Sequence, residues 1–166
     1  MEKRDVEKTI DILILLSGPE PQRTILEEKL KNSFKDTERK VLIIRGVVEK
    51  EQKWETFGKL EMVNFMKSDE LEQTLNKSEI VISRSGYTTI MDLTVLEKKA
   101  FFIPTPGQYE QEYLAKRLKN LGIVPSCKQE KFTVEKLDKV AVYKGLKTIS
   151  PQSNTFPGLF SLFERK

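Results

Sequence analysis

The amino-acid sequence predicts one three-layer α/β domain, with a parallel sheet of about six strands and helices on both faces. Short apolar runs alternate with segments whose apolar residues recur at helical spacing, and this order implies parallel strands with right-handed crossovers. The run Ile80-Val81-Ile82 is β-branched and continuous, as in strands buried on both faces. A chain of 166 residues is also long enough to bury a substantial core.

The first half of the chain predicts three strands and two helices. Residues 1–9 are charged and are expected to form a flexible amino terminus before a domain that we place at 10–149. A loop containing Gly18 and two prolines follows the first strand, because these residues disfavour regular structure. Residues 46–59 are mainly polar and predict a long loop, which in compact domains is often functional. Strands are expected at 10–16, 41–44 and 60–65, and helices from Gln22 and around Leu71 and Leu75.

The second half continues the alternation and ends in an apolar tail. Gly122 stands just past a helical pattern, where a left-handed cap is common. Residues 150–166 contain a stretch rich in proline, serine and glycine and then Leu159-Phe160-Ser161-Leu162-Phe163, which is expected to pack on this domain or on a missing amino-terminal domain. Strands are expected at 80–82, 101–103 and 123–125, and helices after Gly86, through Tyr113, Leu114, Leu118 and Leu121, and from about Thr133.

The composition excludes several classes of protein. Histidine is absent, which excludes mechanisms that need an imidazole base in this chain. Cys127 is the only cysteine, so an internal disulfide and thiol-based metal sites are excluded. The sequence has no signal peptide and no apolar run of the roughly 20 residues that span a bilayer, so we expect a cytoplasmic protein. The net charge of +4 is spread without a basic stripe, which argues against nucleic-acid binding.

The segment from Glu79 to Pro104 is the most informative about function. A buried strand is followed by Arg84-Ser85-Gly86-Tyr87-Thr88-Thr89 and then by a helical run. A helix beginning at Gly86 directs unpaired N–H groups and its positive dipole end outward. Ser85, Thr88 and Thr89 place hydroxyls around the same point, and Arg84 adds a fixed charge. This pattern predicts a site for a phosphate-bearing ligand, with Asp92 on the next turn as an acceptor for ribose hydroxyls. The alternative interpretation is an ordinary turn whose hydroxyls only cap the helix.

Polar or glycine-bearing loops follow five of the expected strands. Ligands of open parallel sheets bind beyond the carboxyl ends of the strands, so these loops are expected to converge. There is no GxGxxG or P-loop motif, and no Asp-x-Asp pair that would support a magnesium-held pyrophosphate. Charge would therefore be neutralised by Arg84, Arg45 or helix N-termini without a metal; for Arg45 a surface salt bridge is the equally weighted alternative. The loops are at Ser17-Gly18, Gly46, 66–68, 84–86 and 105–111.

The loop after residues 101–103 enters a helix whose first turn carries amides and carboxylates. Gln111 and Glu112 lie there and are candidates for reading sugar hydroxyls by paired hydrogen bonds. Glu110 is better explained as an acid that complements the helix dipole.

These residues together resemble the carboxy-terminal half of MurG-like glycosyltransferases, family 28, over roughly residues 10–137. The resemblance implies a Rossmann-like half of a GT-B fold that binds a UDP-sugar, usually UDP-N-acetylglucosamine (UDP-GlcNAc), as donor substrate, with no cofactor and no required metal. It places Ser17 and Gly18 near the diphosphate, Met66 with its backbone on the uracil, and Ser85-Gly86 at the start of the phosphate-facing helix.

The resemblance also implies that Asp92 contacts the ribose and that Gln111 and Glu112 contact the donor sugar. Two departures concern the sugar: the Gly-Gly-Ser loop of the bacterial enzyme is replaced by Ser17-Gly18-Pro19-Glu20, and Ala115 stands where asparagine is common. The acceptor site and catalytic base of two-domain members have no counterpart here.

We therefore expect the donor-binding half of a glycosyltransferase that transfers a hexosyl group. It would be a truncated part of a two-domain enzyme, which we prefer, or a subunit needing a partner; alone it would be inactive or weakly active. A peripheral membrane association is expected for the full enzyme. The alternatives are a non-catalytic nucleotide-binding or scaffold module and, less favoured, a nucleotide-sugar hydrolase.

Overall fold

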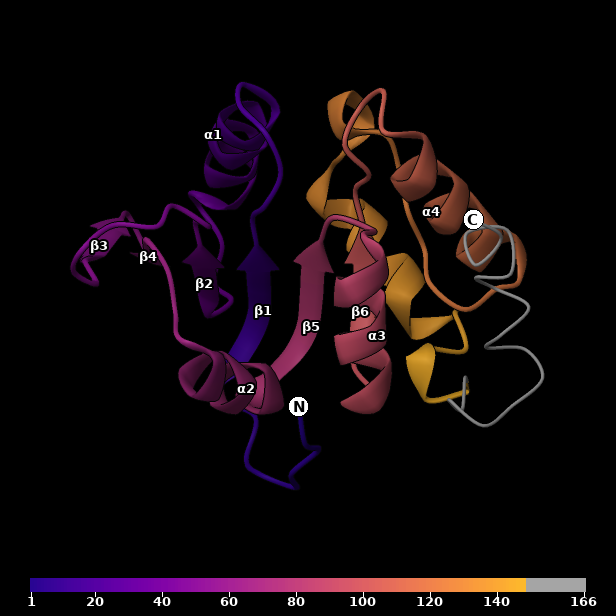
Figure 1. Cartoon of the computed structure of the whole chain (residues 1–166), viewed down its shortest axis with the longest axis horizontal. Helices are drawn as coiled ribbons and strands as arrows, with labels where there is room; N and C mark the ends of the chain where they lie inside the picture. Colours follow the sequence, from indigo (N-terminus) through magenta and orange to yellow (C-terminus); the bar gives the residue numbers. More distant parts are fainter. Residues whose placement is uncertain (149–166) are drawn as a thin grey trace.

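The computed structural model describes residues 1–148 and contains one six-stranded sheet with helices on both faces (Figure 1). The strand order is β3-β4-β2-β1-β5-β6, parallel except that β3 is antiparallel to β4. The strands are β1 (Ile10–Leu15), β2 (Val41–Ile44), β3 (Trp54–Phe57), β4 (Leu60–Val63), β5 (Ser78–Ser83) and β6 (Lys99–Phe102). The α-helices are α1 (Gln22–Phe34), α2 (Ser68–Lys77), α3 (Tyr87–Val95) and α4 (Tyr109–Asn120). Three 3₁₀ helices follow, η1 (Gln129–Lys131), η2 (Val134–Ala141) and η3 (Leu146–Thr148).

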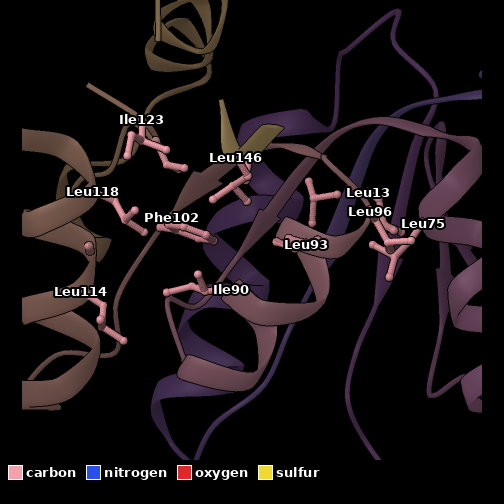
Figure 2. Packing of buried hydrophobic residues seen from close by; sticks show 14 of the residues in the cluster. Leu13, Leu75, Ile90, Leu93, Leu96, Phe102, Leu114, Leu118, Ile123 and Leu146 are labelled. Atoms are coloured by element: carbon pink, nitrogen blue, oxygen red, sulfur yellow. The ribbon is translucent and has the colours of Figure 1, made fainter. Parts of the chain in front are cut away.

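The central strand β1 supplies both layers of the core, because successive side chains of a strand point to opposite faces. Leu13 belongs to a cluster with residues of α2, α3 and α4 on one face of the sheet, and Figure 2 shows this cluster with Phe102, Ile90 and Leu114 among its members. Ile12 and Ile14 belong to a second cluster with α1 and η2 on the other face. All three of these β1 side chains are fully buried. The three-layer α/β prediction is therefore confirmed.

Strand β3 corrects the prediction of an unbroken loop at 46–59. Residues 54–57 pair antiparallel with β4, and Gly58 adopts a φ of +60° in the tight turn between them. All four side chains of β3 are exposed, so the strand carries no burial pattern by which periodicity could find it. The remaining part of the segment is a loop, organised by the buried Asn64, whose side chain bonds Lys53 N, Glu49 and Glu51 O.

The strand predicted at 123–125 is absent. Only one isolated bridge forms there, between Phe102 and Ser126. Pro125 has no N–H to donate, and only its carbonyl takes part, accepting from Phe102 N at 3.0 Å. The helix predicted from about Thr133 is the 3₁₀ helix η2, whereas the cap at Gly122 has the expected positive φ of +67°.

Residues 1–9 have no regular secondary structure, but hydrogen bonds tie them to α2. The side chain of Asn76 accepts from Arg4 N at 2.8 Å and donates to Glu2 O at 3.0 Å. The tail at 150–166 lies outside the described residues. None of the helices within residues 1–148 has the length and apolar character needed to cross a membrane.

Gly46 is the glycine on which the packing of this edge of the sheet most depends. A Cβ added there would lie 2.3 Å from Leu16 O, and its φ is +69°. We expect Gly46→Ala to lower the free energy of unfolding by about 3 kcal/mol or more, because left-handed strain and a backbone clash add. Gly122→Ala is the matched control, since Gly122 has a φ of +67° and nothing within 4 Å; it should cost about 1 kcal/mol. Urea denaturation of both variants checks this, and equal losses would contradict it.

Candidate functional site

The order of the strands creates a divergence between β1 and β5. After β1 the chain proceeds to β2 and β4 on one side, whereas β5 and β6 lie on the other. Loops leaving the carboxyl ends of β1 and β5 therefore turn to opposite faces and leave a crevice, which is the usual ligand position in open α/β sheets. The loops predicted at Ser17-Gly18 and 84–86 lie at this point.

A cavity of about 300 Å³ opens at these carboxyl ends. Its wall includes Ser17, Gly46 and Met66 from the predicted set, together with Ser83 and Thr89. A larger hollow of about 550 Å³ lies at the opposite ends of β1, β5 and β6 and is lined by mixed charges. We assign the candidate site to the smaller cavity, because the hydroxyl-bearing loops and the start of α3 gather there.

The start of α3 is open. Gly86 is its N-cap residue, no side chain caps the helix, and no atom lies within 4 Å of a Cβ added at Gly86. Gly86 has an ordinary φ of −71°, so the backbone conformation itself does not require glycine. Thr88 is exposed on the first turn. The arrangement leaves room for a ligand to approach the positive end of the helix dipole closely.

Ser85 and Arg84 are placed differently from the expectation that they face the ligand. Ser85 is fully buried, and its hydroxyl donates to Gln111 O at 2.7 Å. Arg84 is 1% exposed and donates to Ile103 O at 3.1 Å, Pro104 O at 3.2 Å and Gln22 O at 3.1 Å. The Ser85 hydroxyl and the Arg84 guanidinium therefore donate to backbone carbonyls of other loops, and these hydrogen bonds hold the loops together beneath the site.

The Arg84 guanidinium lies below the site without a carboxylate partner among residues 1–148. Burial lowers its pKa to about 10, which still leaves it protonated at neutral pH. Within residues 1–148, its Nε has no hydrogen-bond partner. A buried cation that is not neutralised by protein contributes a positive potential to the adjoining crevice.

Arg45 is part of an ion-pair network, as its alternative interpretation held. Its Nε donates to Glu27 at 3.0 Å, and Glu27, only 3% exposed, also accepts from Arg23 at 2.7 Å. Arg23 further contacts Glu20 at 2.6 Å and Arg45 O at 3.1 Å. The network therefore connects the β1–α1 loop, α1 and the end of β2.

Met66 lines the cavity, whereas Asp92 lies on α3 and is not among the residues of the cavity wall. Met66 is partly buried, and its Sδ accepts from the Thr74 hydroxyl at 3.4 Å. Asp92 is partly buried on α3, and burial raises the pKa of its carboxyl, partly offset by the positive amino terminus. No Lys or Arg side chain within residues 1–148 pairs with this carboxylate, and a carboxylate held partly out of water is a candidate ligand-binding group.

Gln111 and Glu112 hold the β6–α4 loop. Gln111 accepts from Thr105 N at 2.8 Å through Oε1, and its amide nitrogen has only a long 3.4 Å contact with Gln108. Glu112 accepts from Gly107 N at 3.1 Å through one carboxylate oxygen. The two side chains therefore shape the loop, and the Gln111 amide remains the better placed of the two to meet a ligand.

Thr89, which the sequence places near the Gly86 turn, lines the cavity. Sequence reasoning did not single out Val48, which also lines the cavity, or Thr105, which is buried next to the β1–α1 loop. Val48 and Thr105 lack such a signal, because their place depends on the path of loops.

Comparison with known proteins identifies a family. Residues 12–154 match the family model described as "Glycosyltransferase family 28 C-terminal domain". The UDP-N-acetylglucosamine--N-acetylmuramyl-(pentapeptide) pyrophosphoryl-undecaprenol N-acetylglucosamine transferase of Buchnera aphidicola is 41% identical over 64 residues, covering 38% of this chain and 18% of that enzyme. The enzyme of that name from Methylobacterium radiotolerans is 33% identical over 70 residues, 41% of this chain and 19% of its own length. The matches thus span about a fifth of these relatives.

Solved structures show the same fold. The NMR structure of ALG13 has a TM-score of 0.61 at 14% identity and covers 97% of this chain and 95% of its own. MurG of Acinetobacter baumannii has a TM-score of 0.57 at 21% identity, covering 82% of this chain and 41% of that chain. The expectation of one Rossmann-like half of a GT-B fold is therefore confirmed.

The buried Glu27 carboxylate is expected to stabilise the loops around the site. We expect Glu27→Gln to lower the free energy of unfolding by about 2–4 kcal/mol, because it removes the buried anion that Arg23 and Arg45 share and leaves Arg23 with Glu20 alone. Glu28→Gln is the matched control, since the Glu28 side chain is 57% exposed and pairs with Lys31 at 3.1 Å; its effect should stay within about 0.5 kcal/mol. Urea denaturation measures both, and comparable small losses would refute a structural role for Glu27.

Proposed function

This chain belongs to the glycosyltransferase family 28 C-terminal domain family, and on that premise we propose that it binds the UDP-sugar donor of a hexosyltransferase. The donor sugar proposed is N-acetylglucosamine, as in the names of the curated relatives. One observation carries the proposal: the N-terminus of α3 at Gly86 is uncapped and unobstructed where β1 and β5 diverge.

The proposed role of this corner is to hold the diphosphate. The backbone N–H groups of the first turn and the dipole of α3 would attract the phosphate oxygens, and Gly86 lets these oxygens approach the backbone. Arg84 adds positive potential from below rather than by direct contact, since its guanidinium donors are taken by carbonyls. When the bond between the sugar and the diphosphate breaks, negative charge grows on the diphosphate. The fixed positive groups would stabilise this charge without requiring a metal.

The nucleoside is proposed to lie between Met66 and Asp92. The backbone of Met66 would bond the uracil, and the Asp92 carboxylate would accept from the ribose hydroxyls. The Gln111 amide would bond the sugar, since the Ser85 hydroxyl joins the start of α4 directly to the Gly86 turn.

Transfer also needs an acceptor, whose site we propose to be supplied by another domain or a partner subunit. The curated relatives and the MurG structure are much longer than the region they share with this chain. Because the acceptor must be positioned for rapid transfer, the chain alone is expected to bind donor and turn it over poorly.

Calorimetric titration with UDP, UDP-GlcNAc and GDP tests the proposal directly. We expect micromolar to millimolar binding of the uridine nucleotides, weaker binding of GDP, and the same affinities with magnesium or with EDTA. Binding only in the presence of magnesium would contradict the metal-independent part. Failure of the folded chain to bind any uridine nucleotide would leave the scaffold interpretation as the better one.

Asp92→Asn separates binding from stability. A folded-state pKa above the unfolded value means that the charged carboxylate destabilises the fold at neutral pH, and that this penalty fades as the pH falls towards about 4. We therefore expect a higher melting temperature than wild type at pH 7 and no difference near pH 3. Affinity for UDP should fall about tenfold, equivalent to about 1.4 kcal/mol. Thermal scans at both pH values and UDP titration check this; unchanged UDP affinity would exclude Asp92 from the site.

A further inference from the structure

Thr105 has a buried hydroxyl group with no hydrogen-bond partner. The residue is 1% exposed, and its Oγ1 meets no donor or acceptor within residues 1–148. Its backbone is nevertheless held firmly, with N donating to Gln111 at 2.8 Å and O accepting from Gln108 N at 3.1 Å. An unpaired buried hydroxyl is costly, so its position calls for a physical reason.

The other buried threonines do not share this feature. The Thr94 hydroxyl donates to Ile90 O at 2.7 Å, and the Thr74 hydroxyl donates to Glu70 O at 2.8 Å. Both are on helices and bond the carbonyl four residues earlier. Thr105 is in a loop and has no such carbonyl.

The hydroxyl lies directly under the β1–α1 loop. A Cβ added at Gly18 would be 3.5 Å from Thr105 Oγ1. Gly18 has a φ of +98°, which most residues rarely adopt. The Thr105 hydroxyl therefore lies next to the backbone of the β1–α1 loop at Gly18.

The chemistry around Thr105 indicates what partner is missing. Arg84 bonds the carbonyls of Ile103 and Pro104, immediately before Thr105, and brings a buried positive charge to this corner. An unpaired hydroxyl donor beside a buried cation calls for an acceptor with negative charge. A phosphate oxygen meets that description.

We propose that the Thr105 hydroxyl donates a hydrogen bond to the sugar-side phosphate of the bound nucleotide sugar, once binding displaces the Ser17-Gly18 peptide. This inference rests on the proposed function and adds a phosphate-positioning residue to it. The sugar-side phosphate is favoured because Thr105 lies between Gly18 and Gln111, which stand at the diphosphate and sugar ends of the proposed donor.

The test compares Thr105→Val with Thr105→Ser, which keeps the hydroxyl. Affinities for UMP, UDP and UDP-GlcNAc are measured on the full chain by NMR titration, which follows binding into the millimolar range. We expect Thr105→Val to weaken UDP and UDP-GlcNAc binding about tenfold, to leave UMP binding unchanged because UMP lacks that phosphate, and Thr105→Ser to restore wild-type values.

Thr94→Val is the matched control for stability. It removes an equally buried hydroxyl that is bonded, so its melting temperature should fall by a few degrees while UDP binding is kept. Thr105→Val should melt at or above the wild-type temperature, since it loses no internal hydrogen bond.

Three results would overturn the inference while leaving the proposed function intact: unchanged UDP affinity in Thr105→Val, an equal loss for UMP, or a fall in melting temperature like that of Thr94→Val. If wild-type protein binds no uridine nucleotide, the proposed function itself fails and this inference fails with it.

Discussion

The buried guanidinium of Arg84 is the contact on which the arrangement of the site depends. It bonds the carbonyls of Ile103 and Pro104 beyond β6 and that of Gln22 at the start of α1. These segments are far apart in the chain, and one planar group with several donors holds them together. Burial opposes its charge strongly enough to lower the pKa to about 10, and the carbonyl contacts offset part of that cost. The site is therefore built over an arginine that is charged but inaccessible.

The loops around this arginine are joined by side chains of the type that usually bind ligands. Ser85 bonds the backbone of Gln111, and Gln111 bonds that of Thr105. On the other side, Glu27 bonds both Arg23 and Arg45. These hydrogen bonds hold the loops around the crevice in place before a ligand binds. Less conformational entropy of the loops is therefore lost on binding.

The scaffold and the open groups of the site are thus divided between different residues. Buried polar side chains define the loop paths, whereas the start of α3, the Gln111 amide and the partly buried Asp92 remain for a ligand. Thr105 belongs to neither group in the free chain, since it is buried like the first and unpaired like the second. A hydrogen-bond donor that is covered but unsatisfied is suited to act only after a ligand has moved the loop above it.

Local sequence determined the alternation of strands and helices and the glycines at turns, because these follow from side-chain period and residue type. The place of the crevice between β1 and β5 followed only from the strand order of the folded sheet. Local sequence did not determine β3, whose side chains are all exposed, or the absence of a strand at 123–125. Which polar groups face the crevice was decided only by tertiary structure. Arg84 meets Gln22, and Ser85 meets Gln111, across long stretches of chain. The physical reason is that the direction of a hydrogen-bond donor depends on which acceptor the fold brings close to it. Residue type and spacing along the chain do not specify which distant acceptor that will be.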